Sequence, residues 1–404
     1  TNNIDHRVDS KNPLPSLNLS NPKQIYTTTN SIAEIERAKL VLVFGCDLEK
    51  EHPIINLRVI KSTRKGNVLF LINPDRTKLN RLAQDELIYK KGAEVALLNG
   101  LVREIIEGKL FDSNKIEVSK AEFDRLRQLV LPYEKEKVFQ ITGIAPDKIT
   151  SLANSLARTE SIIILCGKEI FSHPQNKEVI TSLYNLVLLT GHRGKENCGI
   201  DLLREDCNSQ GAADCGLLPD RLPGFVHISD ESKRKQIEEI WKAKLPDKPG
   251  LGFNQILKEI HEDKIKVLYI MGENPLAKYP DKDYIESALK KVDFLVVQDI
   301  FLTETAKLAH LVLPGASFAE KDGTFTNVER RVQKLKKAFN PLGNSKADWE
   351  IVCLLAQAMG YEFEYSSAKE IFDEIACVSP IYENMSYEEI SETGTQWRIK
   401  TREL

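Results

Sequence analysis

The sequence predicts an α/β fold of two lobes with mostly parallel sheets. Short apolar runs recur along the chain, and each ends in a glycine or a polar turn. Segments with helical character separate these runs, so strand, helix and strand alternate. Because such crossovers join parallel strands, the pattern predicts Rossmann-like lobes built from right-handed βαβ units.

The first lobe is expected over residues 1–205, with an N-terminal loop segment at 1–30. Proline, serine, threonine and asparagine are frequent in that opening segment, which favours an extended loop. The uninterrupted apolar runs suit central strands that are covered on both faces. Its clearest strands and helix are expected at Leu40–Phe44, Pro53–Arg64, Val68–Ile72 and Ser161–Leu165.

The second lobe is expected over residues 206–404, including a C-terminal helical tail. Its strands are predicted at Val267–Ile270, Phe294–Val297 and Leu311–Leu313. The sequence VLVFGCDLEKEHP in the first lobe and VLYIMGENPLAKYP in the second share a strand, a glycine, an acid and a proline in the same order. This similarity indicates either two related lobes or the general likeness of any two βα units.

The bulk composition excludes some classes of partner. The 404 residues include 56 basic and 59 acidic side chains, for a net charge of −3, which gives no reason to expect nucleic acid. No apolar run of about 18 residues is present, so no direct membrane insertion is expected. The seven cysteines form no C-x-x-C pair, and their spacing matches no common iron–sulfur run.

The candidate binding residues follow apolar runs, because ligands of open α/β sheets lie at the carboxyl ends of strands. They are Gly45, Asp47, Gly191, Arg204, Gly272, Asn274 and Pro275. Gly191 follows the apolar run 186–189, which we interpret as a strand, and the glycines after it would either hold phosphate or form a structural loop. The Glu329-Arg330-Arg331 run would either bind phosphates or pair with carboxylates.

Several long motifs carry a family resemblance over nearly the whole chain. Residues 310–333, HLVLPGASFAEKDGTFTNVERRVQ, resemble a signature of formate dehydrogenases and their relatives in the molybdopterin oxidoreductase family. The segment LLTGHRGKENCGIDLLREDCNSQGAADCGLLPDRLPG resembles the glycine-rich loop that precedes the family's bis-pterin site, and SKADWEIVCLLAQAMG matches the segment that usually follows. The resemblance implies the two Rossmann-like lobes of that family, without the C-terminal β-barrel of formate dehydrogenases.

Two departures from the family pattern shape the functional hypothesis. In molybdenum and tungsten members, a segment like NNIDH leads to the cysteine or selenocysteine that binds the metal, whereas Lys11 or a neighbour stands there in this chain and no cysteine precedes Cys46. Arg204 matches the family's active-site arginine, but Glu205 and Asp206 replace the usual Gly-Gln. Two carboxylates there would repel an anionic pyrophosphate.

With these departures the chain resembles the large iron–sulfur subunit of respiratory complex I. The first hypothesis is therefore a structural domain of an NADH–quinone oxidoreductase, with no catalytic residue, no metal ligand and only a vestigial pterin-dinucleotide site. Iron–sulfur clusters would lie in a preceding segment or in partner subunits of the membrane-associated complex, and the domain would be cytoplasmic, in its peripheral arm.

Two alternatives remain open. One is a fragment of a formate dehydrogenase that binds molybdenum or tungsten through molybdopterin guanine dinucleotide, with Arg204 as an electrostatic clamp on an anionic substrate. The other is a free-standing nucleotide-binding protein that uses the same strand ends.

Overall fold

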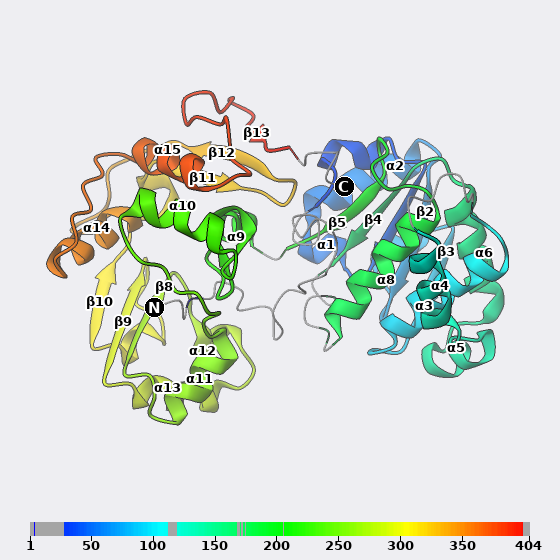
Figure 1. The fold of residues 1–404 in the computed structure, drawn as a ribbon, viewed down its shortest axis with the longest axis horizontal. Coiled ribbons are helices and arrows are strands. Elements are labelled where there is room, and N and C mark those ends of the chain that lie inside the picture. The colour runs from blue at the N-terminus through cyan, green and yellow to red at the C-terminus, as the bar shows by residue number, and fades with distance from the viewer. Residues whose placement is uncertain are drawn as a thin grey trace. The chain divides into compact units, whose positions relative to one another are not determined.

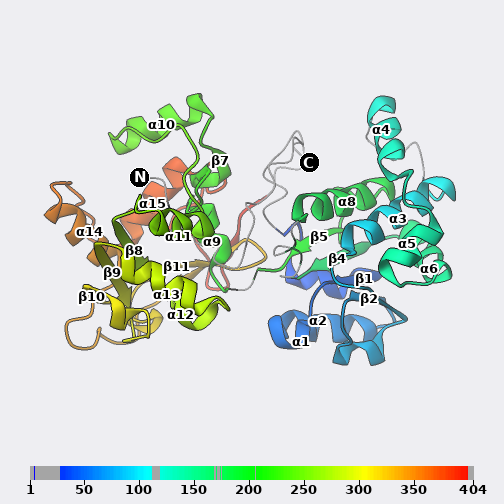
Figure 2. The same ribbon diagram turned by 90° about the horizontal axis from the view of Figure 1, so that it is seen from below.

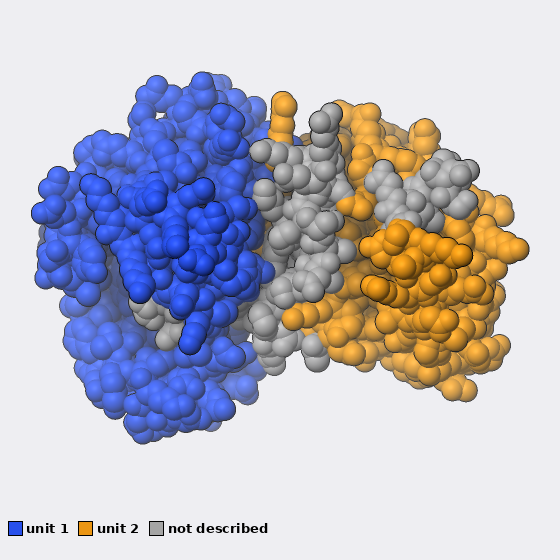
Figure 3. Space-filling model, viewed as in Figure 1, with its two compact units in different colours: residues 1–8, 211–327, 331–397 blue, residues 9–210, 328–330, 398–404 orange. Residues whose placement is uncertain are grey.

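The computed structural model describes residues 4, 28–111, 119–167, 170, 173, 175–204 and 206–398. The chain divides into two compact units (Figure 3). Unit 1 comprises residues 1–8, 211–327 and 331–397, and unit 2 comprises residues 9–210, 328–330 and 398–404. The lobe boundary between residues 205 and 206 stays a prediction, whereas the main change of unit in the structure falls at Gly211.

Unit 2 is built around a five-stranded sheet in which all strands are parallel. Its order is β3-β2-β1-β4-β5. The strands are β1 (Leu40–Phe44), β2 (Val68–Asn73), β3 (Asp85–Ile88), β4 (Ile162–Cys166) and β5 (Gly199–Leu202). The strands and helix expected for this lobe form, within a residue or so of their predicted ends.

Helices cover both faces of this sheet. Figure 2 shows α2 on one face and α3, α6 and α8 on the other. The helices among the described residues of the unit are η2 (Ile32–Glu36), α1 (Leu48–Glu51), α2 (Pro53–Arg64), η3 (Lys78–Leu82), α3 (Glu94–Glu107), α4 (Lys120–Val130), α5 (Lys135–Thr142), α6 (Pro146–Arg158) and α8 (Asn176–Leu189). This arrangement explains why all five residues of β1 are 0 % exposed and why the run is apolar throughout.

The strand inferred at residues 186–189 was wrong, because this run is the last turn of α8. Eight residues of that helix are buried, so it is apolar around much of its circumference. A short apolar run in a buried helix has no periodicity that separates it from a buried strand.

Unit 1 contains a three-stranded parallel sheet of order β10-β9-β8, as the second lobe was expected to. Its strands are β8 (Val267–Met271), β9 (Phe294–Asp299) and β10 (Leu311–Pro314). The helices α11 (Phe253–His261), α12 (Pro275–Lys278) and α13 (Lys282–Lys291) pack on this sheet around a core that includes Leu257, Leu289 and Val297. The same elements lie together at the bottom left of Figure 1.

The rest of unit 1 consists of short antiparallel pairs and further helices. The strands β11 (Gly323–Thr326), β12 (Arg331–Leu335) and β13 (Thr395–Gln396) form one sheet, and β6 (Arg221–Leu222) pairs with β7 (Val226–His227). The helices are α9 (Ser209–Asp214), η4 (Pro223–Phe225), α10 (Glu231–Trp241), η5 (Ala306–Leu308), η6 (Phe318–Glu320), α14 (Asp348–Ala358) and α15 (Ala368–Val378). Among the described residues, no helix is both long enough and apolar enough to cross a membrane.

Candidate functional site

The carboxyl edge of the five-stranded sheet contains a topological switch point. From β1 the chain proceeds to β2 and β3 on one side, and it later returns to β4 and β5 on the other. The switch point therefore lies between the ends of β1 and β4, where Phe44 is paired with Cys166. Crevices of this kind are the usual ligand sites of open α/β sheets.

Glycines follow both strands at this switch point. Gly45 adopts a φ of 61°, which favours glycine. The N–H of Gly167 donates to the carbonyl of Phe44 over 3.0 Å, and a Cβ at position 167 would lie 2.2 Å from the carbonyl oxygen of Gly45. The two turns therefore approach each other at a distance that only glycine permits, and neither glycine places a side chain at the switch point.

Asp47 and Arg204 lie at the same edge. Asp47 precedes α1, and its carboxylate pairs with Lys50 over 2.8 Å. Arg204 follows β5 by two residues and is 8 % exposed. The preceding residue, Leu203, donates its backbone N–H to the carbonyl of Cys166 over 2.8 Å, which holds this turn against the end of β4. The structure thus brings Gly45, Asp47 and Arg204 to one edge.

Gly191 lies elsewhere in the unit. It follows α8 with a φ of 68° and forms the left-handed cap that commonly ends a helix. The next residue, His192, contacts the carbonyl of Thr159 with its Nε2 at 2.7 Å, and Thr159 lies just before β4. Gly191 is therefore at the amino edge of the sheet, and the structure does not bring it together with Gly45 and Arg204.

The remaining candidates lie after β8 in unit 1. Gly272 has a φ of 62° and donates its N–H to the carbonyl of Gln298 in β9 over 2.8 Å. The side chain of Asn274 donates to Glu304 over 2.9 Å and accepts from the hydroxyl of Thr305 over 2.7 Å. Pro275 is the first residue of α12, so these residues fix a turn at the carboxyl edge of the smaller sheet.

A polar network beside that edge was not identified from the sequence. Gln298 is 0 % exposed, accepts a hydrogen bond from the hydroxyl of Tyr269 and donates to Asp348 over 2.6 Å. Asp348 in turn forms an ion pair with Lys321. The sequence signal for this network was Gln298 near the end of an otherwise apolar strand. A glutamine that is buried there needs hydrogen-bond partners.

The contacts of Glu329-Arg330-Arg331 bear on whether this run binds phosphates or pairs with carboxylates. The Glu329 carboxylate accepts the backbone N–H of Ile32 over 2.7 Å, and Arg330 donates to the carbonyl of Thr29 over 3.0 Å. Both side chains are less than 10 % exposed and belong to unit 2, whereas Arg331 donates to the carbonyl of Gly394 in unit 1 over 3.2 Å. These contacts hold backbone in place, so packing is a sufficient role for the run.

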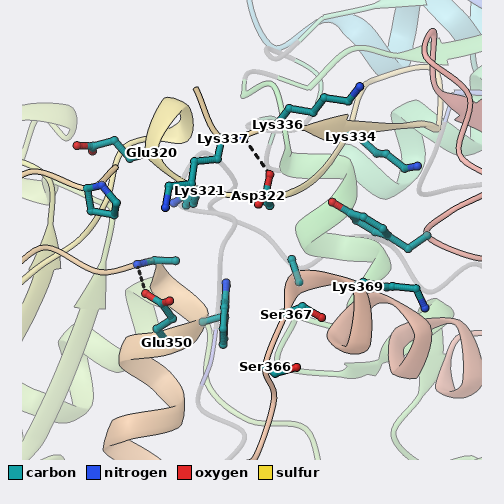
Figure 4. Close-up of a pocket in the computed structure, with 15 residues that line it drawn as sticks. Glu320, Lys321, Asp322, Lys334, Lys336, Lys337, Glu350, Ser366, Ser367 and Lys369 are labelled. Carbon is teal, nitrogen blue, oxygen red and sulfur yellow. Dashed lines mark hydrogen bonds between the residues drawn. The ribbon is translucent and has the colours of Figure 1, made fainter. Parts of the chain in front are cut away.

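A basic pocket of about 520 Å³ is present in unit 1 (Figure 4). Lys321, Lys334, Lys336, Lys337 and Lys369 line it, together with three carboxylates and two aromatic rings. Backbone N–H groups hold all three carboxylates, and those bonds lower the pKa of Glu320. The excess of lysine favours an anionic occupant, although the pocket is not at a strand edge.

The switch-point residues suit the pterin dinucleotide that the family resemblance implies. Gly45 and Gly167 place no side chain between this edge and a pyrophosphate, and Arg204 supplies a positive charge at the same edge. Lys50 offsets the charge of Asp47, and Asp206 is exposed. Glu205 and Lys11, on which the sequence argument against a bound cofactor also depended, lie outside the described residues.

Comparison with known proteins finds several formate dehydrogenases among the relatives of this chain. The chain is 39 % identical over 401 residues to the F420-dependent formate dehydrogenase subunit alpha of Methanocaldococcus jannaschii, covering 98 % of this chain and 59 % of that protein. It is 33 % identical over 371 residues to formate dehydrogenase H of Escherichia coli, covering 91 % of this chain and 52 % of that protein. The chain thus spans somewhat more than half the length of these relatives.

These relatives overturn the complex I hypothesis. That hypothesis depended on two departures from the family pattern, at Lys11 and at Glu205 and Asp206, and not on similarity along the whole chain. Similarity over 91–100 % of this chain to proteins named formate dehydrogenases favours the formate dehydrogenase alternative. The expectation that this segment holds no cofactor is likewise not supported.

The fold agrees with this relationship. Acetylene hydratase from Pelobacter acetylenicus superposes with a TM-score of 0.69 at 20 % identity, over 91 % of this chain and 54 % of that structure. At that identity the likeness concerns the fold alone. The family model described as molybdopterin oxidoreductase matches residues 1–358. The chain therefore belongs to the molybdopterin oxidoreductase family.

Proposed function

We propose that this chain is the major part of a formate dehydrogenase alpha subunit and contributes to a bis-pterin site that holds molybdenum or tungsten. The observation that carries the proposal is the conjunction of Gly45, Gly167 and Arg204 at the switch point of a chain whose relatives, at up to 39 % identity, are named formate dehydrogenases. When bound, the metal centre would supply the two-electron redox chemistry.

The chain's own residues would bind and orient the cofactor and the anionic substrate. The glycine turns let the backbone approach a pyrophosphate without a side chain between them. Arg204 is buried, so its guanidinium acts in a medium of lower dielectric than water. A charge held there would bind either the pyrophosphate or the formate anion, and formate is the assignment that kinetics can test directly.

The electrons would leave through groups outside these residues. The sequence has no C-x-x-C pair, and we propose that iron–sulfur clusters lie in a preceding segment or in partner subunits. Any association with a membrane would then come through those partners.

The test uses the complete protein, purified anaerobically. Elemental analysis and the fluorescence of oxidised pterin are expected to find molybdenum or tungsten and pterin in stoichiometric amounts. Formate is expected to reduce a viologen dye. A protein that holds neither metal nor pterin, or that holds both and leaves formate unchanged, would overturn the proposal.

Substitution of Arg204 tests its assignment. Arg204→Ala is expected to lower kcat/KM for formate roughly 100-fold or more, because one positioned donor is worth about this much in a buried site. Arg193→Ala is the matched control, since Arg193 lies at the amino edge beside His192. Equal effects of the two substitutions would contradict a role for Arg204 at the site.

A further inference from the structure

Three side chains with metal-ligand chemistry converge on the turn between β1 and α2. They are Cys46, Glu51 and His52, and one ligand atom from each lies within 4.8 Å of the other two. In a tetrahedral zinc site with bonds of roughly 2.0–2.3 Å, neighbouring ligand atoms are roughly 3.5 Å apart. Closing the set around an ion therefore needs movements on the order of 1 Å, which side-chain rotation provides.

Cys46 is held firmly in this position. It is 4 % exposed and belongs to the hydrophobic core cluster that contains Val43 and Val59. The side chain of Asn73 accepts the backbone N–H of Cys46 over 2.8 Å and donates to its carbonyl over 3.2 Å. Gly167 packs beside this residue so closely that a Cβ at position 167 would lie 2.5 Å from the Cβ of Cys46. The thiol is thus preorganised by its surroundings.

Glu51 supplies the observation that points to a cation. Its Oε1 accepts the backbone N–H of Asp47 over 2.9 Å, which fixes the carboxylate. Its Oε2 is buried and has no hydrogen-bond partner among the described residues. The adjacent lysine, Lys50, pairs with Asp47 instead. A buried carboxylate oxygen without a partner is costly, and a bound cation would satisfy it.

We propose that Cys46, Glu51 and His52 bind one zinc ion, with water as the fourth ligand. A thiolate, an imidazole nitrogen and a carboxylate oxygen suit zinc among divalent metals, and three protein ligands leave one position open. On binding, the thiol releases its proton to solvent and the imidazole is neutral.

The ion would stabilise helix α1 by cross-linking the residues around it. Helix α1 has only four residues, too few to be stable without other contacts, and the proposed ligands lie before it, within it and after it. The bound ion would fix the loop after β1 and the start of α2, at the sheet edge where Gly45 lies. The inference stands on this geometry and is independent of the proposed redox function.

The experiment is a titration of the complete, chelator-treated protein with Co²⁺ as a spectroscopic substitute for zinc. We expect one equivalent to bind with a thiolate-to-cobalt charge-transfer absorption and with tetrahedral d–d bands. Cys46→Ser is expected to abolish the charge-transfer absorption. Cys377→Ser is the matched control, because that thiol is exposed on α15, and it is expected to leave the spectrum unchanged.

Glu51→Gln and Asn73→Ala test the rest of the site. Each is expected to weaken cobalt binding roughly tenfold or more, the first by removing a ligand charge and the second by releasing the Cys46 backbone. The proposal is overturned if Co²⁺ gives no thiolate absorption, or if the absorption survives Cys46→Ser. If circular dichroism shows that Cys46→Ser does not fold, an affinity unchanged by Glu51→Gln overturns it instead.

Discussion

The two parallel sheets of this chain differ in how their faces are covered. Every residue of β1 in unit 2 is 0 % exposed, because helices pack on both faces of the five-stranded sheet. In β8 of unit 1, Val267, Tyr269 and Met271 are 62 %, 38 % and 47 % exposed. These three side chains alternate along the strand and share one face. The smaller sheet thus presents an apolar face to solvent in this chain, while the larger one does not.

The ends of the two sheets differ in a second way. Gly45 and Gly272 have almost the same φ, 61° and 62°, and each donates its N–H to the neighbouring strand. The local turns are therefore equivalent, as the similar sequences indicated. Only the five-stranded sheet has a switch point, because β8, β9 and β10 follow one another in chain order. Equivalent turns consequently lie beside a switch point in one sheet and not in the other.

The largest effect is expected from a methyl group added at position 167, where two turns meet at the switch point. Gly167→Ala is expected to lower the free energy of unfolding by about 3 kcal/mol or more, since its Cβ would meet backbone that cannot rotate away. Gly272→Ala is expected to cost only about 1 kcal/mol, because no atom lies within 4 Å of its Cβ and the left-handed φ alone opposes alanine.

Urea unfolding measures both variants. All three tryptophans, Trp241, Trp349 and Trp397, belong to unit 1, so their fluorescence follows that unit, whereas circular dichroism follows the whole chain. If Gly167→Ala lowers the free energy of unfolding no more than Gly272→Ala does, the two sheet edges tolerate an added methyl group equally well.

The next effect concerns an ionisable group in the larger sheet. Burial raises the pKa of Asp201 to about 7, and the N–H of Asn30 and the charge of Arg330 offset this only in part. The folded chain therefore retains a proton between about pH 4 and 7 that the unfolded chain releases. Stability from this group is present below about pH 4 and is lost as the pH rises through about 7.

Asp201→Asn should remove that loss. Relative to the parent protein, the variant is expected to gain up to about 4 kcal/mol at about pH 8 and little near pH 4, because its side-chain oxygen still accepts from Asn30. Unfolding curves across this range check the prediction, with Asp299→Asn at the half-buried end of β9 as the control. A stability difference that does not change with pH would refute it.

The smallest effect compares the same truncation on the two sheets. Val41→Ala in β1 is expected to cost about 2 kcal/mol, for two lost methyl groups and the cavity they leave. Val267→Ala is expected to change stability by less than about 0.5 kcal/mol, because the side chain already contacts water. Matched urea titrations decide the point, and similar costs would mean that the face of β8 is covered in solution.

Much of the fold was predictable from local pattern. Runs such as Leu40–Phe44 and Val267–Ile270 end in glycine turns, and the turns formed where the pattern placed them. The run at 186–189 was misread because a helix that is buried around much of its surface lacks a periodic signal. The candidate site was predictable only as a set of turns, and Gly191 was grouped with Gly45 because a sequence does not state which edge a turn occupies.

The sequence by itself determined the α/β class, the repeated βα units and, through its long motifs, the family. These features depend on contacts between near neighbours and on motifs retained in order. Only the tertiary structure decided that Gly167 meets Gly45, that Arg204 shares their edge, and that Cys46, Glu51 and His52 converge beside a clamp from Asn73. The reason is physical: strand order and side-chain direction arise from packing between segments that lie far apart along the chain.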